Sequence, residues 1–425
     1  MSRRILLVKP PEHSQFNFGA FSLAVLAAGV RDLVDLEILD ATNLDLGAAV
    51  KAVWQRQPDL IGITTMGITS VAPASAFVRA LQQTQVATRK VPIVVGGHGA
   101  SCLARPVLEA GADVVVRGEG EISFRRLLEE RCWSEVPGTI HLGDGKLKTA
   151  APAPPIEPLD CLSLPARDLL PWPTGHVHLM ETSRGCPHAC NFCETTRFFA
   201  RRWRAHSPER VVQEVVRLVK KFNAWIIHIS DDNFAADPRR VRRICQLLGG
   251  RDLPAFFMVS ARADDLTADP ELIPAMAGAR FLRVSVGVET LDQRLAQAAG
   301  KPIPAAVYQA VFKRLRMHGI FSVASFIVGL PGETTEIRRG ALRMALEVAP
   351  DAARFVPFLP MPGVPMAKGG GGVEPDPIHA REAQRLNTEF LSAPCVSQRL
   401  IQAVEAGGIR GILARGVTAR DAALK

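Results

Sequence analysis

The sequence predicts an α/β protein of two domains, a doubly wound domain followed by a partial β/α barrel, and three observations carry this prediction. The chain has 425 residues, which is too long for one ordinary hydrophobic core. Short, continuous apolar runs alternate with segments in which apolar residues recur every three or four positions, as buried parallel strands alternate with helices. The proline-dense stretch 136–175 interrupts this alternation, so we expect a linker there.

The first domain is expected over residues 1–135. Its helical patterns alternate with apolar runs, so helices should cover both faces of a parallel sheet, as in open Rossmann-like folds. The five expected strands are 3–10, 34–41, 59–67, 91–99 and 111–119. Ligands of such sheets bind at the carboxyl ends of the strands. Those ends are rich in glycine and threonine here, and small residues let a bulky ligand approach the backbone closely.

The second domain is expected over residues 176–368, with a short helical tail at 369–425. Its six expected strands are 176–185, 224–232, 255–263, 281–289, 321–331 and 352–362. Helical segments separate them, and the first of these should begin at Pro208 with Ser207 as its N-cap. Six consecutive β/α units predict a partial (β/α)6 barrel of the TIM type, with its active site at the carboxyl ends of the strands.

Composition narrows the class of protein. The formal net charge is +9, but its densest clusters, 201–204 and 239–243, fit solvated helix faces, so we expect no nucleic-acid partner. Neither a signal peptide nor an apolar run of membrane-spanning length is present, which predicts a cytoplasmic protein with no membrane association. Eight cysteines are too few for a disulfide framework. Five of them stand alone and are expected to be buried and inert: Cys102, Cys132, Cys161, Cys245 and Cys395.

The other three cysteines form a C-x3-C-x2-C motif, Cys186, Cys190 and Cys193, directly after the first expected barrel strand. Three thiolates on a tight loop fit a [4Fe–4S] cluster that keeps one iron open for a substrate or cofactor. Structural zinc is the alternative, with His188 as a strained fourth ligand, but no second cysteine pair is present. We therefore predict that the three cysteines are the metal ligands and the catalytic centre.

This motif, with an aromatic residue before its third cysteine, resembles that of the radical S-adenosylmethionine (SAM) enzymes. The resemblance implies that the open iron chelates the amino and carboxylate groups of SAM, and that one electron cleaves SAM to a 5′-deoxyadenosyl radical. Further motifs at successive strand ends, "ISDDNF", "SARAD", "VSVGVET" and "FIVGLPGET", match the same family. Together they imply these SAM-site residues: Phe192, Asp231, Asp232, Arg262, Ser285, Glu289 and Gly329.

The first domain resembles the cobalamin-binding branch of these enzymes in "DLIGITTM", "VVGGHGAS" and "ADVVVRGEGEISFRRLL". The implied cobalamin-site residues are Thr64, Thr65, Met66, Gly67, Gly96, Gly97, His98, Gly118, Glu119 and Gly120. The Asp-x-His-x-x-Gly signature is missing, so no histidine of that loop should bind cobalt from below. We expect Met66 as a neighbour of the lower face, and His98 as a packing or phosphate-edge residue.

The resemblance implies a methyltransferase that moves a methyl group from methylcobalamin to an unactivated carbon, or to phosphorus, after the radical abstracts hydrogen. Three alternatives stay open: an oxidative cyclase or rearrangement enzyme resembling the anaerobic magnesium-protoporphyrin ester cyclases, a methylthiotransferase-like RNA-modifying enzyme, and a non-catalytic module. The RNA-modifying enzymes carry a second trio of cysteines in their N-terminal domain, whereas the first domain here has only Cys102 and Cys132. Expected partners are a small-molecule or peptide substrate and a flavodoxin- or ferredoxin-type electron donor, and we expect a monomer.

Overall fold

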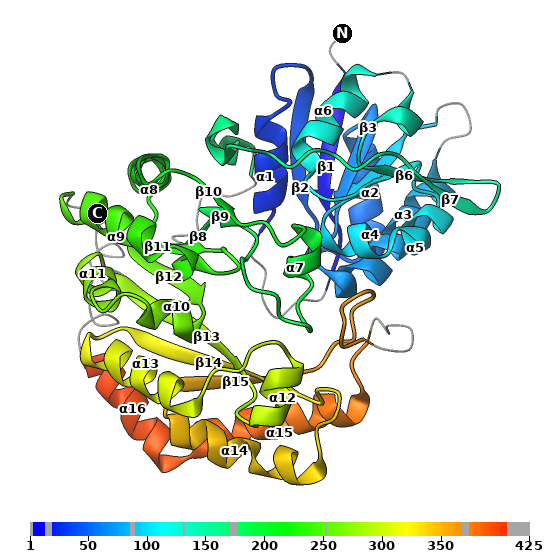
Figure 1. Cartoon of the computed structure of the whole chain (residues 1–425). Helices are drawn as coiled ribbons and strands as arrows, with labels where there is room; N and C mark the ends of the chain where they lie inside the picture. Colours follow the sequence, from blue (N-terminus) through cyan, green and yellow to red (C-terminus); the bar gives the residue numbers. More distant parts are fainter. Residues whose placement is uncertain are drawn as a thin grey trace. The chain divides into compact units, whose positions relative to one another are not determined.

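Figure 1 shows the computed structural model of the chain, coloured from blue at the N-terminus to red at the C-terminus. The structure describes residues 3–12, 19–85, 90–130, 132–170, 177–251, 253–367 and 374–405. The chain divides into two structural units, Met1–Pro173 and Thr174–Lys425. The end of the expected linker, 171–175, and parts of the expected tail, 369–373 and 406–425, lie outside the described residues.

Unit 1 is built on a seven-stranded sheet, and its first five strands in the chain are the five that the sequence predicts. In sheet order the strands are β2 (Asp35–Asp40), β1 (Arg4–Lys9), β3 (Leu60–Thr64), β4 (Ile93–Gly96), β5 (Val114–Val116), β6 (Thr139–Gly143) and β7 (Lys146–Thr149). Strands β1 to β5 pair in parallel. The chain order reverses between β1 and β3, and such a switch point is where open α/β sheets bind their ligands.

Helices cover both faces of this sheet, which confirms the doubly wound fold. The helices are α1 (Phe21–Ala28), α2 (Leu46–Gln55), α3 (Val71–Thr84), α4 (His98–Cys102), α5 (Ala104–Glu109) and α6 (Gly120–Glu129). Strand β1 shows how the sequence supplies both cores. Ile5 and Leu7 belong to the apolar cluster beside α1, whereas Leu6 and Val8 belong to the cluster beside α2 and α3. A continuous apolar strand is therefore buried on both sides.

Part of the expected linker is instead a β-hairpin. Strand β6 pairs antiparallel with β5, and β7 pairs antiparallel with β6. The turn between them uses Asp144 and Gly145 at φ values of 53° and 71°, the left-handed pair that a tight hairpin requires. The sequence signal for this hairpin is the Asp-Gly dipeptide between two short alternating runs. The prediction of a linker gave more weight to the surrounding prolines than to this dipeptide. After β7, the described residues to 170 contain only the short turns η3 (Leu159–Cys161) and η4 (Arg167–Leu169).

Unit 2 contains the six predicted barrel strands as one parallel sheet. The strands are β8 (Val177–Met180), β11 (Ile226–Ile229), β12 (Phe256–Ala261), β13 (Phe281–Glu289), β14 (Phe321–Val328) and β15 (Ala352–Pro357). They lie side by side in chain order (Figure 1), and every registered pair is parallel. Sequential parallel neighbours are the arrangement of a β/α barrel, here with six strands.

Helices follow the strands of unit 2 in sequence. They are α7 (Thr195–Phe198), α8 (Pro208–Phe222), α9 (Pro238–Gly249), α10 (Ala263–Thr267), α11 (Leu272–Gly278), α12 (Gln293–Ala298), α13 (Ala305–Met317), α14 (Thr335–Val348), α15 (Pro377–Ser392) and α16 (Pro394–Glu405). The predicted cap of α8 is confirmed, because the Ser207 side chain accepts a hydrogen bond from the Arg210 backbone. Within the described ranges, no helix combines the length and apolar character needed to cross a membrane.

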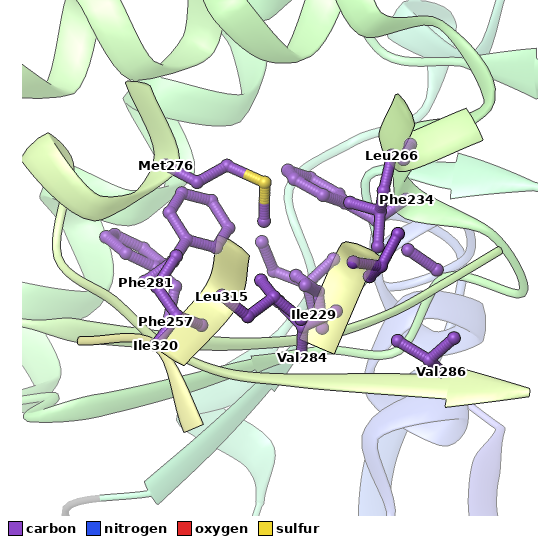
Figure 2. Close-up of a cluster of buried hydrophobic side chains, with 14 of the residues drawn as sticks. Ile229, Phe234, Phe257, Leu266, Met276, Phe281, Val284, Val286, Leu315 and Ile320 are labelled. Atoms are coloured by element: carbon purple, nitrogen blue, oxygen red, sulfur yellow. The ribbon is translucent and has the colours of Figure 1, made fainter. Parts of the chain in front are cut away.

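The core of unit 2 lies between the outer face of the sheet and the helices. Figure 2 shows Val284 and Val286 of β13 in this core with Phe234, Phe257 and further apolar side chains. The residues that alternate with these valines, including Arg283 and Ser285, are partly buried on the opposite, inner face. Alternation along the strands therefore separates an apolar helix-covered face from an inner face that carries polar side chains.

Candidate active site

The cysteine loop begins where a two-stranded ribbon ends. Strand β9 (Ser183–Arg184) pairs antiparallel with β10 (Arg204–Ala205), and this pairing closes the loop that contains the three cysteines. Gly185 has φ of +82°, and a Cβ atom there would lie 2.0 Å from the carbonyl oxygen of Arg202. Only glycine therefore fits the position before Cys186.

Two consecutive aspartates after β11 attach the loop to the sheet. The buried Asp231 carboxylate accepts hydrogen bonds from the Thr182 backbone (2.7 Å), the Thr182 hydroxyl (2.5 Å) and the Ser183 hydroxyl (2.7 Å). The Asp232 carboxylate accepts from the Gly185 backbone at 3.2 Å and from the Thr195 hydroxyl at 2.8 Å. Both side chains thus position the cysteine loop, and direct contact of either with SAM stays a prediction.

The three cysteines of the motif are half-buried free thiols. Burial, with smaller contributions from the like charges of the neighbouring Cys190 and Cys193, raises the pKa of Cys186 to about 11. Burial also raises the pKa of Cys190, against the opposing charges of Arg262 and Lys301. The costly ionisation of Cys186 and Cys190 fits a bound metal cluster, which holds its thiol ligands deprotonated.

Arg262, at the end of β12, lies against the cysteine loop. Its Nη1 donates to Cys190 Sγ at 3.2 Å, while Nε and Nη2 form a bidentate pair with Asp264 at 3.0 and 2.7 Å. Next to it, the buried Asn233 amide donates to Asp265 at 2.6 Å, and His188 Nε2 lies 2.8 Å from the same carboxylate oxygen. This bond directs His188 Nε2 to Asp265, which disfavours the alternative of a zinc site with His188 as fourth ligand.

Glu289 ends β13 beside the same site. Its carboxylate lies 2.9 Å from Lys301 Nζ, and both side chains are largely buried. The register of β13 shifts between Gly287 and Glu289, and Glu289 has φ of +66°. A Cβ atom at Gly287 would lie 2.3 Å from the Glu289 carboxylate and 2.7 Å from Lys301 Nζ. Glycine at 287 is therefore what lets this ion pair lie across the end of the strand.

Three more predicted SAM-site residues have different surroundings. Phe192 packs against a small apolar cluster that contains Leu330 and Phe358. Gly329 has φ of +87°, donates its backbone N–H to Glu333, and has His379 so close that no side chain fits. Ser285 lies on the inner face of β13, in register with Ser260 and Val323. Their roles toward SAM stay predictions, and for Gly329 the observed reason for glycine is the contact with His379.

In unit 1, the predicted cobalamin-site residues gather at the carboxyl ends of β3, β4 and β5. Thr65 is fully buried, and its hydroxyl donates to Gly96 and accepts from the Ala100 backbone, both at 2.8 Å. Gly97 has φ of +96°, and a Cβ atom there would lie 2.3 Å from the Thr65 carbonyl oxygen. These residues, with the buried Thr64, set the path of the two loops.

Other residues of this set face open space. A Cβ atom on Gly67 or Gly118 would meet no atom within 4 Å, and Met66 beside Gly67 is 44% exposed although it is a large apolar residue. Two bare glycine backbones and an exposed methionine at neighbouring strand ends fit a broad ring lying against them. The open space beside Gly67 and Gly118 therefore suits cobalamin, with Met66 as the predicted neighbour of its lower face.

The remaining three residues border these loops. Glu119 accepts a hydrogen bond from the Ile156 backbone at 3.2 Å, and Gly120 begins α6 close to Leu26. His98 begins α4, and burial lowers its pKa to about 4, so it is neutral at neutral pH. This fits the predicted packing role of His98.

Sequence reasoning missed several residues that complete the site. Its ion pairs and hydrogen bonds also involve four residues that were not predicted: Asn233, Asp264, Asp265 and Lys301. Asp264 and Asp265 belong to the quoted motif "SARAD" and its next residue, whereas nothing around Lys301 signals its role. The structure also corrects the expectation that the single cysteines are buried. Cys245 is buried and Cys102 is partly buried, but Cys132, Cys161 and Cys395 are exposed.

Comparison with known proteins gives two domain matches. The radical SAM superfamily model matches residues 180–345, and the B12 binding domain model matches residues 13–128. An uncharacterized methyltransferase, PH0819, from Pyrococcus horikoshii is 30% identical over 385 residues, covering 85% of this chain and 81% of that protein. The anaerobic magnesium-protoporphyrin IX monomethyl ester cyclase of Rubrivivax gelatinosus is 28% identical over 388 residues, covering 84% of this chain and 68% of the cyclase.

A solved structure agrees in fold. The radical SAM methyltransferase TsrM from Kitasatospora setae, with tryptophan substrate and a SAM analogue bound, matches with a TM-score of 0.74 at 21% identity, covering 86% of this chain and 75% of TsrM. Both domains and their order thus agree with one family. The chain belongs to the cobalamin-dependent radical SAM methyltransferases, enzymes that use a [4Fe–4S] cluster, SAM and cobalamin.

Proposed function

We propose that this enzyme methylates an unactivated carbon atom of a small organic molecule. The observation that carries the proposal is the combination, in one chain, of a three-thiol loop beside Arg262 with glycine-lined strand ends suited to cobalamin. When bound, the reduced cluster would cleave SAM to provide the hydrogen-abstracting radical, and cobalamin would supply the methyl group. A small-molecule substrate also agrees with the tryptophan bound to TsrM.

The side chains around the cysteine loop would bind and position the cofactors. Cys186, Cys190 and Cys193 would hold the cluster, and the Arg262 guanidinium would stabilise the charge on the Cys190 thiolate. The Glu289–Lys301 pair offers one anion and one cation side by side, which suits the amino and carboxylate groups of SAM. In unit 1, Gly67 and Gly118 would leave room for cobalamin, with Met66 against its lower face.

The strands of unit 2 favour radical chemistry over acid–base chemistry. On the six described barrel strands, Glu289 is the one acidic residue, and it is paired with Lys301. An unactivated carbon has no proton that a carboxylate or histidine could remove at neutral pH. The remaining inner-face side chains therefore serve to orient the substrate and to exclude water from it.

The test uses anaerobically purified, cluster-reconstituted protein that has been loaded with cobalamin. Incubation with a reductant, candidate small molecules and SAM bearing a deuterated methyl group should give a product heavier by one labelled methyl group, measured by mass spectrometry. Variants with Cys186, Cys190 or Cys193 replaced by alanine should give no product. SAM cleavage by the parent enzyme that yields only unlabelled, rearranged or dehydrogenated products would overturn methyl transfer.

The second candidate function is oxidative cyclisation, and the similarity to the Rubrivivax cyclase over 84% of this chain favours it. The same mass measurement separates the two reactions. Cyclisation removes hydrogen atoms and transfers no label, whereas methylation adds one labelled group. A flavodoxin- or ferredoxin-type protein stays the predicted electron donor in both cases.

A further inference from the structure

The inner face of the barrel sheet carries a guanidinium that nothing nearby neutralises. Arg283 alternates on β13 with Val284 and Val286, which lie in the helix-covered core, so its side chain projects from the inner face. Among the described residues its guanidinium has neither an ion pair nor a hydrogen bond, and its Nε is buried without a partner. Burying an unpaired charge is costly, and proteins rarely keep one without a use for it.

On the described barrel strands, no side chain offers Arg283 a counter-charge. His228 lies on β11, two strands from β13, and shares a register row with Arg283 through Met258. Burial, with a smaller contribution from the charge of Arg283, lowers the pKa of His228 to about 4, so this side chain is neutral at neutral pH. Farther along the inner face, β15 carries Arg354, in register with Ser325 of β14. The one acidic residue on the six described strands, Glu289, is already paired with Lys301. The inner face is therefore cationic and has no carboxylate to spare for Arg283.

Arg283 lies well away from the cysteine loop. It is in register with Met258, and Met258 precedes Arg262 by four residues along β12. At about 3.3 Å per residue, the row of Arg283 lies roughly 13 Å from the row of Arg262, toward the amino ends of the strands. Arg283 is thus too far along the strand to serve the cluster, and it is placed where the far end of a molecule bound along the inner face would reach.

We propose that Arg283 binds an anionic oxygen group, a carboxylate or a phosphonate, at the end of the substrate remote from the carbon that is methylated. This inference rests on the proposed function and names the substrate class for it. A guanidinium binds such groups through two parallel hydrogen bonds, which also fixes the orientation of the ligand. The arginines after the cysteine loop are placed differently: Arg197, for example, donates to the Pro362 carbonyl oxygen at 2.9 Å.

The test measures the binding of three probes to the holoenzyme by calorimetry: phenylhexanoate, its uncharged methyl ester, and phenylhexylphosphonate. The wild type should bind at least one of the two acids about tenfold more tightly than the ester, as expected for a charge-assisted bond. In Arg283→Met this preference should disappear, whereas the matched control Arg343→Met, an exposed arginine of α14, should keep it. Comparing the two acids identifies which oxygen group the site favours.

Further measurements distinguish a loss of anion binding at Arg283 from misfolding of the variant and from a failure of the proposed methyl transfer. Arg283→Lys retains the charge and should keep part of the preference, so a Met variant that fails to fold leaves the proposal testable. Substrate-free cleavage of SAM should be unchanged in both variants. An equal preference in Arg283→Met and wild type, no preference in the wild type, or loss of SAM cleavage with an intact cluster would each overturn the role of Arg283. Failure of methyl transfer itself leaves these binding results unaffected.

Discussion

At the residue scale, the site depends on charged side chains whose partners come from distant parts of the chain. Glu289 and Lys301 are separated by an entire helix, yet their charges lie 2.9 Å apart in a largely buried position. The motif "VSVGVET" predicts the acid, but no local pattern predicts its lysine, because the pair forms only when the loop after α12 folds back. The motif thus predicts one member of this ion pair, and only the folded structure reveals the other.

Replacing Lys301 by methionine should lower both stability and SAM cleavage. The change leaves the Glu289 carboxylate buried without its counter-charge, and breaking a buried pair in this way costs about 3–5 kcal/mol. Chemical denaturation and the rate of 5′-deoxyadenosine formation measure the two effects. Lys313→Met, on the exposed side of α13, is the control and should change neither. The double variant with Glu289→Gln should regain stability but not SAM cleavage, and recovery of both would contradict a cofactor role for the pair.

His98 should make the stability of unit 1 depend on pH. Burial lowers its pKa to about 4 in the folded protein, below the roughly 6.5 of an unfolded chain. Between these values the unfolded state binds more protons, so stability should fall as the pH decreases from about 6.5 to about 4. His98→Gln removes this titration and should flatten the pH dependence of the unfolding midpoint. An unchanged slope in the variant would show that other groups cause the acid sensitivity.

At the element scale, strands were the most predictable part of the chain. All five parallel strands of unit 1 and all six of unit 2 are predicted by short apolar runs, because the buried positions of a strand require apolar residues. The β6–β7 hairpin was missed because its outer strand is exposed and lacks an apolar run. The loops of the site were located by motif, but their close contacts, such as Thr65 against Gly97, depend on tertiary packing.

Two glycines of unit 1 should respond differently to alanine. Gly97→Ala would place a Cβ atom 2.3 Å from the Thr65 carbonyl oxygen at a positive φ, so the apo-protein should lose stability. Gly67→Ala meets no atom within 4 Å and has an extended backbone at φ of −154°, so apo-protein stability should change by less than about 0.5 kcal/mol. Its methyl group would nevertheless occupy the space expected for cobalamin. Urea unfolding and cobalamin retention measure both effects, and full retention by Gly67→Ala would contradict the site.

At the scale of the whole molecule, two units with separate cores carry the two metal cofactors. The fold class and the order of the units could be predicted, because a domain-sized pattern is local in sequence. The three cysteines were located by a short motif, and their role as ligands stays a prediction. The cationic inner face could not be predicted, since Arg283 and Arg354 come from strands far apart in the sequence. Their common face becomes evident only from the register of the sheet.

Removal of iron should affect the two units unequally. The cysteine ligands belong to unit 2, and a metal that binds only the folded state stabilises the unit that holds it. A chelator applied to the anaerobic holoenzyme should therefore lower one thermal transition in calorimetry by several degrees, while the visible spectrum of bound cobalamin stays unchanged. Release of cobalamin in step with iron loss would contradict the independence of the two units.

The hairpin that extends the sheet of unit 1 bears on how the protein behaves at high concentration. Its outer strand β7 is exposed along its whole length and carries Lys146 and Lys148, with β6 as its neighbour in the described sheet. An open strand edge is a template on which a second molecule can add its own strand, and lysines oppose this because stacked copies would repel one another. The Lys148 ammonium is paired with Asp144 at 3.1 Å, so we expect Lys146 to oppose self-association most, and a variant that neutralises Lys146 should precipitate first.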